Sequence, residues 1–343
     1  MLKRVTNPWV VCLSAACFFF YQFIQITSFN VLKPDLTVAF DTSSAMLSLV
    51  SSLYFYGTVA FLIPAGILLD NLSTRAIILM AMGLSLIGLV IFSSATNIYV
   101  AGIGRFIIGV SGGPFCFLST MRLASRWFPE ERLAFVTGII VSLGMCGGIV
   151  AQTPFILLVA TVGWKTAMLV NLLLGAAIAL ILYLFVQDYP PGKEQEYLQQ
   201  RAFYRTNGFV KGLKVVMLKK QNWYCGVFAS LLNLPIFVFG ALWGIMYVTQ
   251  IYGLTSIEAS LICSMLFIGM IIGAPVFGFI SDKLHLRKIP MFMGVVICIL
   301  AMSFLIKSTN LSFLGLAFVF YFMGFGSSAQ ILAYPTITET NPL

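Results

Sequence analysis

The sequence is poor in charge. Only 9% of its 343 residues are Asp, Glu, Lys or Arg, whereas 60% are hydrophobic and the mean hydropathy is +0.99. A soluble domain carries about 25% charged residues, because water must solvate its surface. The shortage of charge therefore excludes a soluble globular domain and indicates a surface that faces lipid.

Acidic side chains are missing where an enzyme within a membrane would need them. The 11 Asp and Glu residues lie in predicted loops or at predicted helix ends, and none falls near the middle of an apolar segment. Intramembrane catalysis needs paired acids, a His-rich metal motif or a Ser–His pair, so we expect no enzyme. Proton coupling would also need a protonatable group, for which Asp35 is the best candidate; facilitated diffusion or exchange is the alternative.

Metal-binding side chains are scarce as well. His285 is the only histidine, and it lies in a predicted cytoplasmic turn. The seven cysteines all fall in apolar segments, with no pair at metal-ligand or disulfide-framework spacing. The sequence therefore predicts no metal site, no cofactor and no catalytic residue.

Long apolar runs are abundant. A helix needs roughly 20 apolar residues to cross about 30 Å of hydrocarbon. Ten segments meet this requirement, at residues 8–31, 45–69, 76–94, 98–122, 133–158, 164–186, 223–249, 257–280, 289–306 and 311–333. We therefore predict an all-α, multi-pass membrane protein. The first segment is too long for a signal peptide and lacks a small-residue cleavage site, so it is interpreted as a span.

The net charge of +9 follows the predicted topology. With the N-terminus in the cytoplasm, 16 of the 20 Lys and Arg residues fall in cytoplasmic segments; Lys33, Lys165 and Lys307 fall outside, and Arg105 lies within a span. This asymmetry is the positive-inside rule and sets the orientation. The basic excess is thus explained without nucleic-acid binding.

One short polar phrase occurs twice, 212 residues apart, each time between two apolar segments. Each copy has a Gly, an Asp four residues later and an Arg five residues after that: Gly66, Asp70 and Arg75, then Gly278, Asp282 and Arg287. Duplicated turns at matching points of two helical halves are typical of transporters built from structural repeats.

The duplicated phrase also predicts how the chain is divided. We expect a six-helix bundle over residues 1–186, a basic cytoplasmic linker over 187–221, and a second bundle over 222–343 with four of an expected six helices. Residues 334–342 have the composition of a turn that leads into a further helix. This pattern favours a truncated chain, with a natural ten-helix protein as the alternative.

Taken together, these motifs resemble those of the major facilitator superfamily across essentially the whole chain. That family's loop between helices two and three has the pattern Gly-x-Leu-x-Asp-x-x-Gly-Arg-Lys, which is matched at Gly66, Leu68, Asp70 and Arg75. Arg105 and Gly109 match the family's fourth-helix motif, and residues 125–132 and 163–165 are similar to its later loops. The Gly-Pro step of the family's antiporter motif is absent from the fifth segment, which lowers the odds of a drug/proton antiporter.

The resemblance to the nutrient and organic-solute porters of this family implies a function. It implies a secondary active or facilitative transporter of an amino acid, peptide or organic anion, working by alternating access in the cell (inner) membrane. We expect a monomer whose partners are the solute, membrane lipid and, if transport is coupled, a proton. The alternatives are a solute receptor that does not transport, and an inactive, truncated remnant.

The resemblance also assigns roles to residues. It implies that Gly66, Asp70, Arg75, Gly278, Asp282 and Arg287 form a conformational latch that does not touch solute; a simple basic turn with a capping carboxylate is the alternative. Arg105 lies about 10 Å into its span at 1.5 Å per residue, where an unpaired Arg is costly. It is either a ligand for an anion, since guanidinium offers a bidentate fork, or a structural group bonded to helix carbonyls.

The predicted solute site draws on polar and aromatic residues of the helices expected to line a cavity near the membrane midplane. Interhelical hydrogen bonds and interfacial aromatics are the alternative interpretation of each one. The candidates are Gln25, Arg105, Gln152, Asn233, Trp243 and Tyr321.

Overall fold

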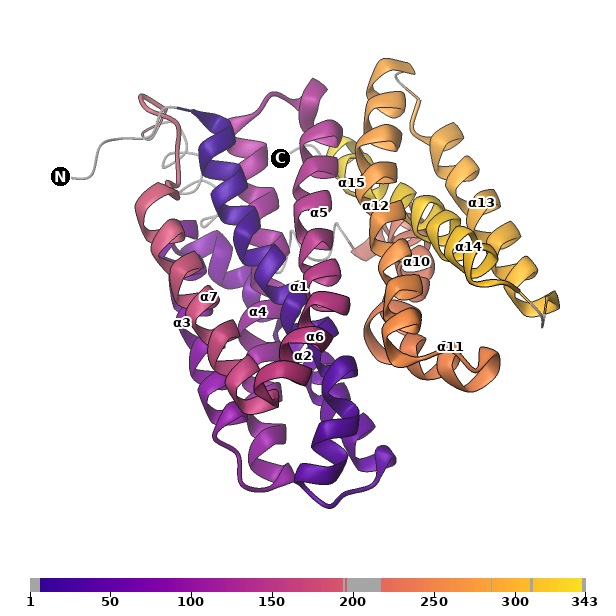
Figure 1. Cartoon of the computed structure of the whole chain (residues 1–343). Coiled ribbons are helices and arrows are strands. Elements are labelled where there is room, and N and C mark those ends of the chain that lie inside the picture. The colour runs from indigo at the N-terminus through magenta and orange to yellow at the C-terminus, as the bar shows by residue number, and fades with distance from the viewer. Residues whose placement is uncertain (1–6, 194, 196–216, 285, 309–310, 341–343) are drawn as a thin grey trace. The chain divides into compact units, whose positions relative to one another are not determined.

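A computed structural model describes residues 7–193, 195, 217–284, 286–308 and 311–340 (Figure 1). Within these residues the chain is helical and contains no strand. It divides into two compact units, one formed by residues 1–123 and 147–190 and the other by residues 124–146 and 191–343. Most of the predicted linker, including residue 194 and residues 196–216, lies outside the described residues.

All ten predicted membrane spans are present in the described part of the chain. Each contains an 18-residue window of mean hydropathy between 1.4 and 2.6. The spans are Pro8–Ala39, Ser44–Asn71, Thr74–Ser93, Ile98–Trp127, Leu133–Val162, Trp164–Phe185, Lys220–Leu242, Ser256–Leu284, Lys288–Lys307 and Phe313–Ile337. The apolar runs therefore located every span, and the boundaries differ by up to eight residues.

The first unit is built around helix α1 (Pro8–Ala39), whose most apolar window is 72% buried. Helix α7 (Trp164–Phe185) packs along both α1 and α3 (Thr74–Ser93). Helix α4 (Ile98–Trp127) approaches α2 (Ser44–Asn71) so closely that a Cβ atom on Gly109 would collide with the backbone oxygen of Tyr54. A small residue at this position allows the two backbones to meet.

The fifth predicted span is interrupted. Helix α5 (Leu133–Val150) ends, and α6 (Thr153–Val162) begins after Gln152, which has φ −91° and ψ −116°. Pro154 stands in the first turn of α6, where its missing N–H costs nothing. Because Pro154 cannot donate a hydrogen bond back to the preceding turn, a continuous helix over 133–158 is not formed. Residues of α5 up to Cys146 belong to the second unit.

The seventh predicted span is also broken. Helix α10 (Lys220–Pro235) leads into a π-helical stretch, η2 (Ile236–Leu242), and then into α11 (Gly244–Tyr252). The wide turn is closed by the backbone N–H of Trp243, which donates to the oxygen of Val238, five residues earlier, at 2.8 Å. Gly253, with φ of 68°, terminates α11 in the left-handed conformation.

The second unit is organised around α12 (Ser256–Leu284). Helix α14 (Phe313–Ser327) packs along α12, and α13 (Lys288–Lys307) packs along α14, as Figure 1 shows. The chain continues through a 3₁₀ turn, η3 (Ser328–Leu332), into α15 (Ala333–Thr340), which contacts α10. The prediction of a turn over 334–342 is therefore wrong for residues 334–340, because these residues continue as a helix packed on α10. A shorter 3₁₀ turn, η1 (Glu130–Arg132), precedes α5.

Candidate functional site

The second copy of the duplicated phrase forms a closed polar cluster. The Asp282 carboxylate accepts a hydrogen bond from the backbone N–H of Phe135 at 3.1 Å. It also accepts one from the guanidinium of Arg287 at 2.7 Å. Since α5 begins at Leu133, the N–H of Phe135 belongs to its first turn, which has no helical acceptor of its own. Asp282 therefore ties the end of α12 to the start of α5.

Arg287 links this cluster to α15. Its Nη2 atom donates to Oε1 of Glu339 at 2.7 Å, and its Nη1 atom also donates to the Ser281 hydroxyl at 2.9 Å. Burial lowers the pKa of the Arg287 guanidinium, but the hydrogen bonds and charges of Glu339 and Asp282 outweigh it and raise the pKa. The side chains of Arg287 and Asp282 are only 18% and 16% exposed, so this pair is partly shielded from water.

Gly278 brings α12 close to α5. A Cβ atom on Gly278 would lie 2.9 Å from the backbone oxygen of Ala134, closer than such atoms approach in proteins. Two helical turns further along, the hydroxyl of Ser142 donates to the backbone oxygen of Ile271 at 2.8 Å. The glycine and the carboxylate of the phrase thus serve the same contact between α12 and α5.

The first copy is arranged differently. Asp70 pairs with Arg122 of α4 at 3.0 Å, and 67% of the Asp70 side chain is exposed. Arg75 donates instead to the backbone oxygen of Tyr183 at 2.6 Å and stacks on that ring at 5.4 Å. A Cβ atom on Gly66 would meet nothing within 4 Å. The two copies are therefore equivalent in sequence and unequal in contacts.

The start of α3 is held by a residue that sequence reasoning did not select. The hydroxyl of Ser73 accepts from the N–H of Ala76, and the carboxylate of Asp188 accepts from the Ser73 hydroxyl at 2.5 Å and from the N–H of Arg75 at 3.0 Å. Asp188 follows α7, so it joins the ends of α3 and α7. Its only sequence signal is its place between an apolar run and the prolines at 190 and 191.

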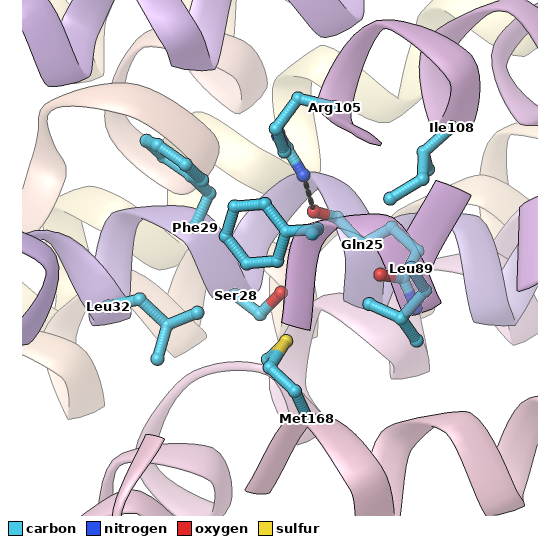
Figure 2. Close-up of a pocket in the computed structure, with 9 residues that line it drawn as sticks. Gln25, Ser28, Phe29, Leu32, Leu89, Arg105, Ile108 and Met168 are labelled. Carbon is cyan, nitrogen blue, oxygen red and sulfur yellow. Dashed lines mark hydrogen bonds between the residues drawn. The ribbon is translucent and has the colours of Figure 1, made fainter. Parts of the chain in front are cut away.

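Arg105 is buried inside the first unit. Its Nη1 atom donates to the backbone oxygen of Gln25 in α1 at 2.7 Å (Figure 2). The guanidinium carbon lies 4.7 Å from the ring centre of Phe29 and 5.2 Å from that of Tyr54. This is the bond to a helix carbonyl that the structural interpretation requires, strengthened by two cation–π contacts.

Some hydrogen-bond donors of the Arg105 guanidinium nevertheless have no partner among the described residues. Its Nε and Nη2 atoms are buried and have no hydrogen-bond partner among the described residues, and neither has Nε2 of the Gln25 side chain. A cavity of about 10 Å³ adjoins them, lined by Gln25, Ser28, Phe29, Leu32, Leu89, Phe92, Arg105, Ile108 and Met168. A volume of that size holds about one water molecule. Two guanidinium nitrogens and a side-chain amide of residues that line this cavity thus remain without a hydrogen-bond partner among the described residues.

The other predicted solute ligands lie in different surroundings. Gln152 is fully buried at the break between α5 and α6. In the second unit, Asn233 is half-buried in α10, Trp243 is 40% exposed where η2 meets α11, and Tyr321 stacks on Phe325 in α14. Within the first unit the structure brings together Gln25 and Arg105. Asp35, the predicted proton-coupling residue, lies exposed near the end of α1.

A second buried polar pair connects α1 with α3. The side-chain amide of Gln22 in α1 donates to the Ser85 hydroxyl of α3 at 2.9 Å, and both side chains are fully buried. Gln22 falls three residues before Gln25 and therefore shares its face of α1.

This helical bundle of apolar spans defines a multi-pass membrane protein with a duplicated polar turn. The sequence profile of the Major Facilitator Superfamily matches residues 11–342. The chain belongs to this family, which confirms the resemblance and makes it a protein of a transporter family and not an enzyme.

Curated relatives carry varied names. The chain is 21% identical over 293 residues to a probable sulfoacetate transporter, SauU, of Cupriavidus necator, covering 84% of this chain and 68% of that protein. It is 23% identical over 270 residues to the sialic acid transporter NanX of Escherichia coli, covering 76% of this chain and 60% of that protein. A drug efflux pump of Mycobacterium tuberculosis, JefA, is 26% identical over 170 residues, with 33% of its length covered. The chain thus spans from one third to about two thirds of these relatives.

A solved structure shares the fold. The crystal structure of a bacterial homolog of the human lysosomal transporter Spinster, in an inward-facing and unoccupied conformation, aligns with a TM-score of 0.63 and 17% identity. The alignment covers 96% of this chain and 75% of that one. This chain therefore shares its fold with that structure.

Proposed function

We propose that this chain carries a small organic anion across the cell membrane by alternating access. The observation that carries the proposal is Arg105, a cation buried to 97% that forms no ion pair with a carboxylate among the described residues. Burying an unpaired charge in hydrocarbon is costly. An anionic solute would offset that cost and occupy the two free guanidinium N–H groups.

The names of several relatives support the same class of solute. Sulfoacetate, sialic acid and hexuronate, for which three of the relatives are named, each carry a carboxylate or sulfonate. The cavity beside Arg105 has room for about one water molecule and not for such a solute. Binding therefore requires α1 and α4 to separate around the guanidinium, so that the Gln25 carbonyl gives way to the solute.

The contact between α12 and α5 supplies a latch for alternating access. Asp282 and Gly278 hold these helices together in the present conformation through the N–H of Phe135 and the backbone of Ala134. Separation of α12 from α5 would break the hydrogen bond from Phe135 and leave the pair between Asp282 and Arg287 intact, since Asp282 lies in the last turn of α12 and Arg287 lies in the turn that follows it. The latch thus couples the loss of one hydrogen bond to the movement of a whole helix.

The test is a thermal-shift screen of the purified chain against carboxylates, sulfonates, amino acids and neutral sugars. A ligand at 100 times its dissociation constant stabilises the folded protein by about 2.7 kcal/mol. Arg105→Lys retains the positive charge but loses the paired N–H donors of the guanidinium. It should weaken anion binding roughly tenfold or more, as expected for hydrogen bonds to charged groups. Arg122→Lys is the matched control, because Arg122 lies in the same helix at its far end.

Uptake into proteoliposomes then separates the alternatives. Binding with uptake supports the transporter, and binding without uptake supports a receptor. A folded chain that binds no solute supports an inactive remnant. Anion binding that survives in a folded Arg105→Lys protein would overturn the role of Arg105 and leave it as a structural residue.

A further inference from the structure

A groove of about 600 Å³ opens in the second unit where α10 and α13 begin. Gln221, Tyr224 and Phe228 line it from α10, at the spacing of one helical stripe. Met291 of α13 lines it from the other side, and the buried Thr336 of α15 also borders it. The groove is sixty times larger in volume than the cavity beside Arg105, and Arg287 of the predicted latch also lines it.

The polar end of the groove is positively charged. Helices α10 and α13 both begin there, with Lys219 and Arg287 as their N-cap residues. Neither cap makes a side-chain hydrogen bond to its helix, and neither helix has an acidic residue in its first turn. The next residues along the chain, Lys220 and Lys288, add exposed ammonium groups, and Lys288 lines the groove. Two positive helix ends and the ammonium group of Lys288 thus border the groove.

The contrast with the start of α3 shows what such a helix end requires. There, Ser73 and the carboxylate of Asp188 accept the hydrogen bonds of the first turn. At the start of α13 the neighbouring carboxylates, Asp282 and Glu339, are both engaged by Arg287. The charge of Lys288 has no counterpart of this kind among the described residues, so an external anion would complement it.

The groove becomes apolar with depth. From Gln221 to Phe228 the stripe on α10 advances seven residues, or about 10 Å into the membrane span. Phe228 of α10 and Met291 of α13 supply apolar walls, and Tyr224 lies four residues before Phe228 with 68% of its surface exposed. Trp223 is 54% exposed at the same level. Tyr and Trp at this position mark the interface between headgroups and hydrocarbon.

We propose that this groove binds an anionic phospholipid, with its phosphate beside Lys288 and the start of α13 and an acyl chain along Phe228 and Met291. The charge at the polar end and the apolar walls below it match the two halves of such a lipid. Basic pockets between membrane helices bind anionic headgroups by the same physics. The inference depends on insertion in a membrane and not on the proposed anion transport.

A membrane helix from another polypeptide is the competing occupant. In the first unit, α7 lies along α1 and α3 and supplies Asp188 to the α3 start. A helix with an acid at its end could fit α10 and α13 in the same manner. The lipid is favoured because its phosphate supplies the anion and every bilayer with acidic lipid offers it.

The test compares dioleoyl phosphatidylglycerol with dioleoyl phosphatidylcholine, titrated into the full 343-residue chain and observed by native mass spectrometry. The phosphatidylglycerol should bind more tightly, and Lys288→Gln should weaken it about fivefold while leaving phosphatidylcholine unchanged. Lys307→Gln is the matched control, because it removes an exposed lysine from the opposite end of α13. Equal binding of the two lipids, or an equal loss in both variants, would overturn the proposal.

A second measurement locates the lipid. Met291→Trp should fill the deeper part of the groove and reduce phosphatidylglycerol binding without removing a charge. A phosphatidylglycerol with a photoreactive acyl chain should label peptides that contain Phe228 or Met291. Labelling confined to other helices, or cross-links to a second polypeptide in place of lipid, would assign the groove to a different occupant and contradict the proposal.

Discussion

Asp282 accepts a hydrogen bond from the backbone N–H of Phe135 at 3.1 Å, and this bond joins two helices that are 147 residues apart in the sequence. Asp70, the equivalent residue of the first copy, binds the side chain of Arg122 and remains mostly exposed. The two copies of the phrase therefore make different contacts. The contacts of these two copies, of Arg105 and of Asp188 lead to four predictions.

Asp282→Ala should destabilise the protein more than Asp70→Ala. The Asp282 pair is largely shielded, and its removal leaves Arg287 and the N–H of Phe135 short of an acceptor, at about 1–3 kcal/mol. In the pair of Asp70 and Arg122 the carboxylate is exposed to solvent, and exposed ion pairs contribute about 0–1 kcal/mol to stability. Thermal unfolding of both variants in the same detergent measures the difference. Equal losses would mean that the two copies contribute equally.

Gly278→Ala should be damaging and Gly66→Ala harmless. At Gly278 the new methyl group would press on the backbone oxygen of Ala134, so α12 and α5 must move apart. At Gly66 it meets open space, and alanine is favoured over glycine within a helix by about 1 kcal/mol. Melting temperatures and uptake rates of the two proteins provide the comparison. A tolerated Gly278→Ala would show that the close approach has no role.

The contact of Arg105 with Phe29 should appear as a coupling energy. A double-mutant cycle with Arg105→Met and Phe29→Leu should give about 0.5–2 kcal/mol, as expected for a cation held over an aromatic face. The same cycle with Phe18→Leu is the control, since Phe18 is buried eleven residues away on α1. Unfolding free energies of the single and double variants supply both cycles, and similar coupling in the two would contradict the cation–π assignment.

Asp188→Ala should loosen the junction between α3 and α7. The variant loses the acceptor for the N–H of Arg75 and for the hydroxyl of Ser73, and loss of a helix cap costs about 0.5–2 kcal/mol. Asp188→Asn keeps one side-chain oxygen and should lose less. Hydrogen exchange of the first turn of α3 reports the local effect, and unchanged protection in both variants would rule out a capping role.

The site residues show how far sequence reasoning reaches. Arg105 could be selected because a cation inside an apolar run is conspicuous, and its environment is fixed by nearby helices of one unit. Asp188 and Glu339 could not, because each is an ordinary acid near a helix end that gains its role only from a residue of another element, 113 or 52 residues away. Acids at helix ends are common in any membrane protein, and the sequence carries no mark of which one meets a distant helix start.

The broken spans show a similar limit. Apolar composition located the fifth and seventh spans, but hydropathy is insensitive to whether backbone hydrogen bonds run to the fourth or the fifth residue. Pro154 and Pro235 each mark a break in these spans. Sequence alone does not reveal whether a proline bends, interrupts or merely starts a helix, because neighbouring helices decide which freed backbone groups are satisfied.

The sequence by itself determined the class of this protein. A helix crosses lipid only if its apolar stretch is long enough, so composition and segment length specify the ten spans and the membrane location, and the repeated phrase specifies the family. The tertiary structure alone decided the contacts. It placed Asp282 on the start of α5 and Asp70 at the surface, set Arg105 against α1, and opened the groove between α10 and α13. The physical reason is that a hydrogen bond or a groove depends on two surfaces at once, whereas hydrophobicity belongs to each segment separately.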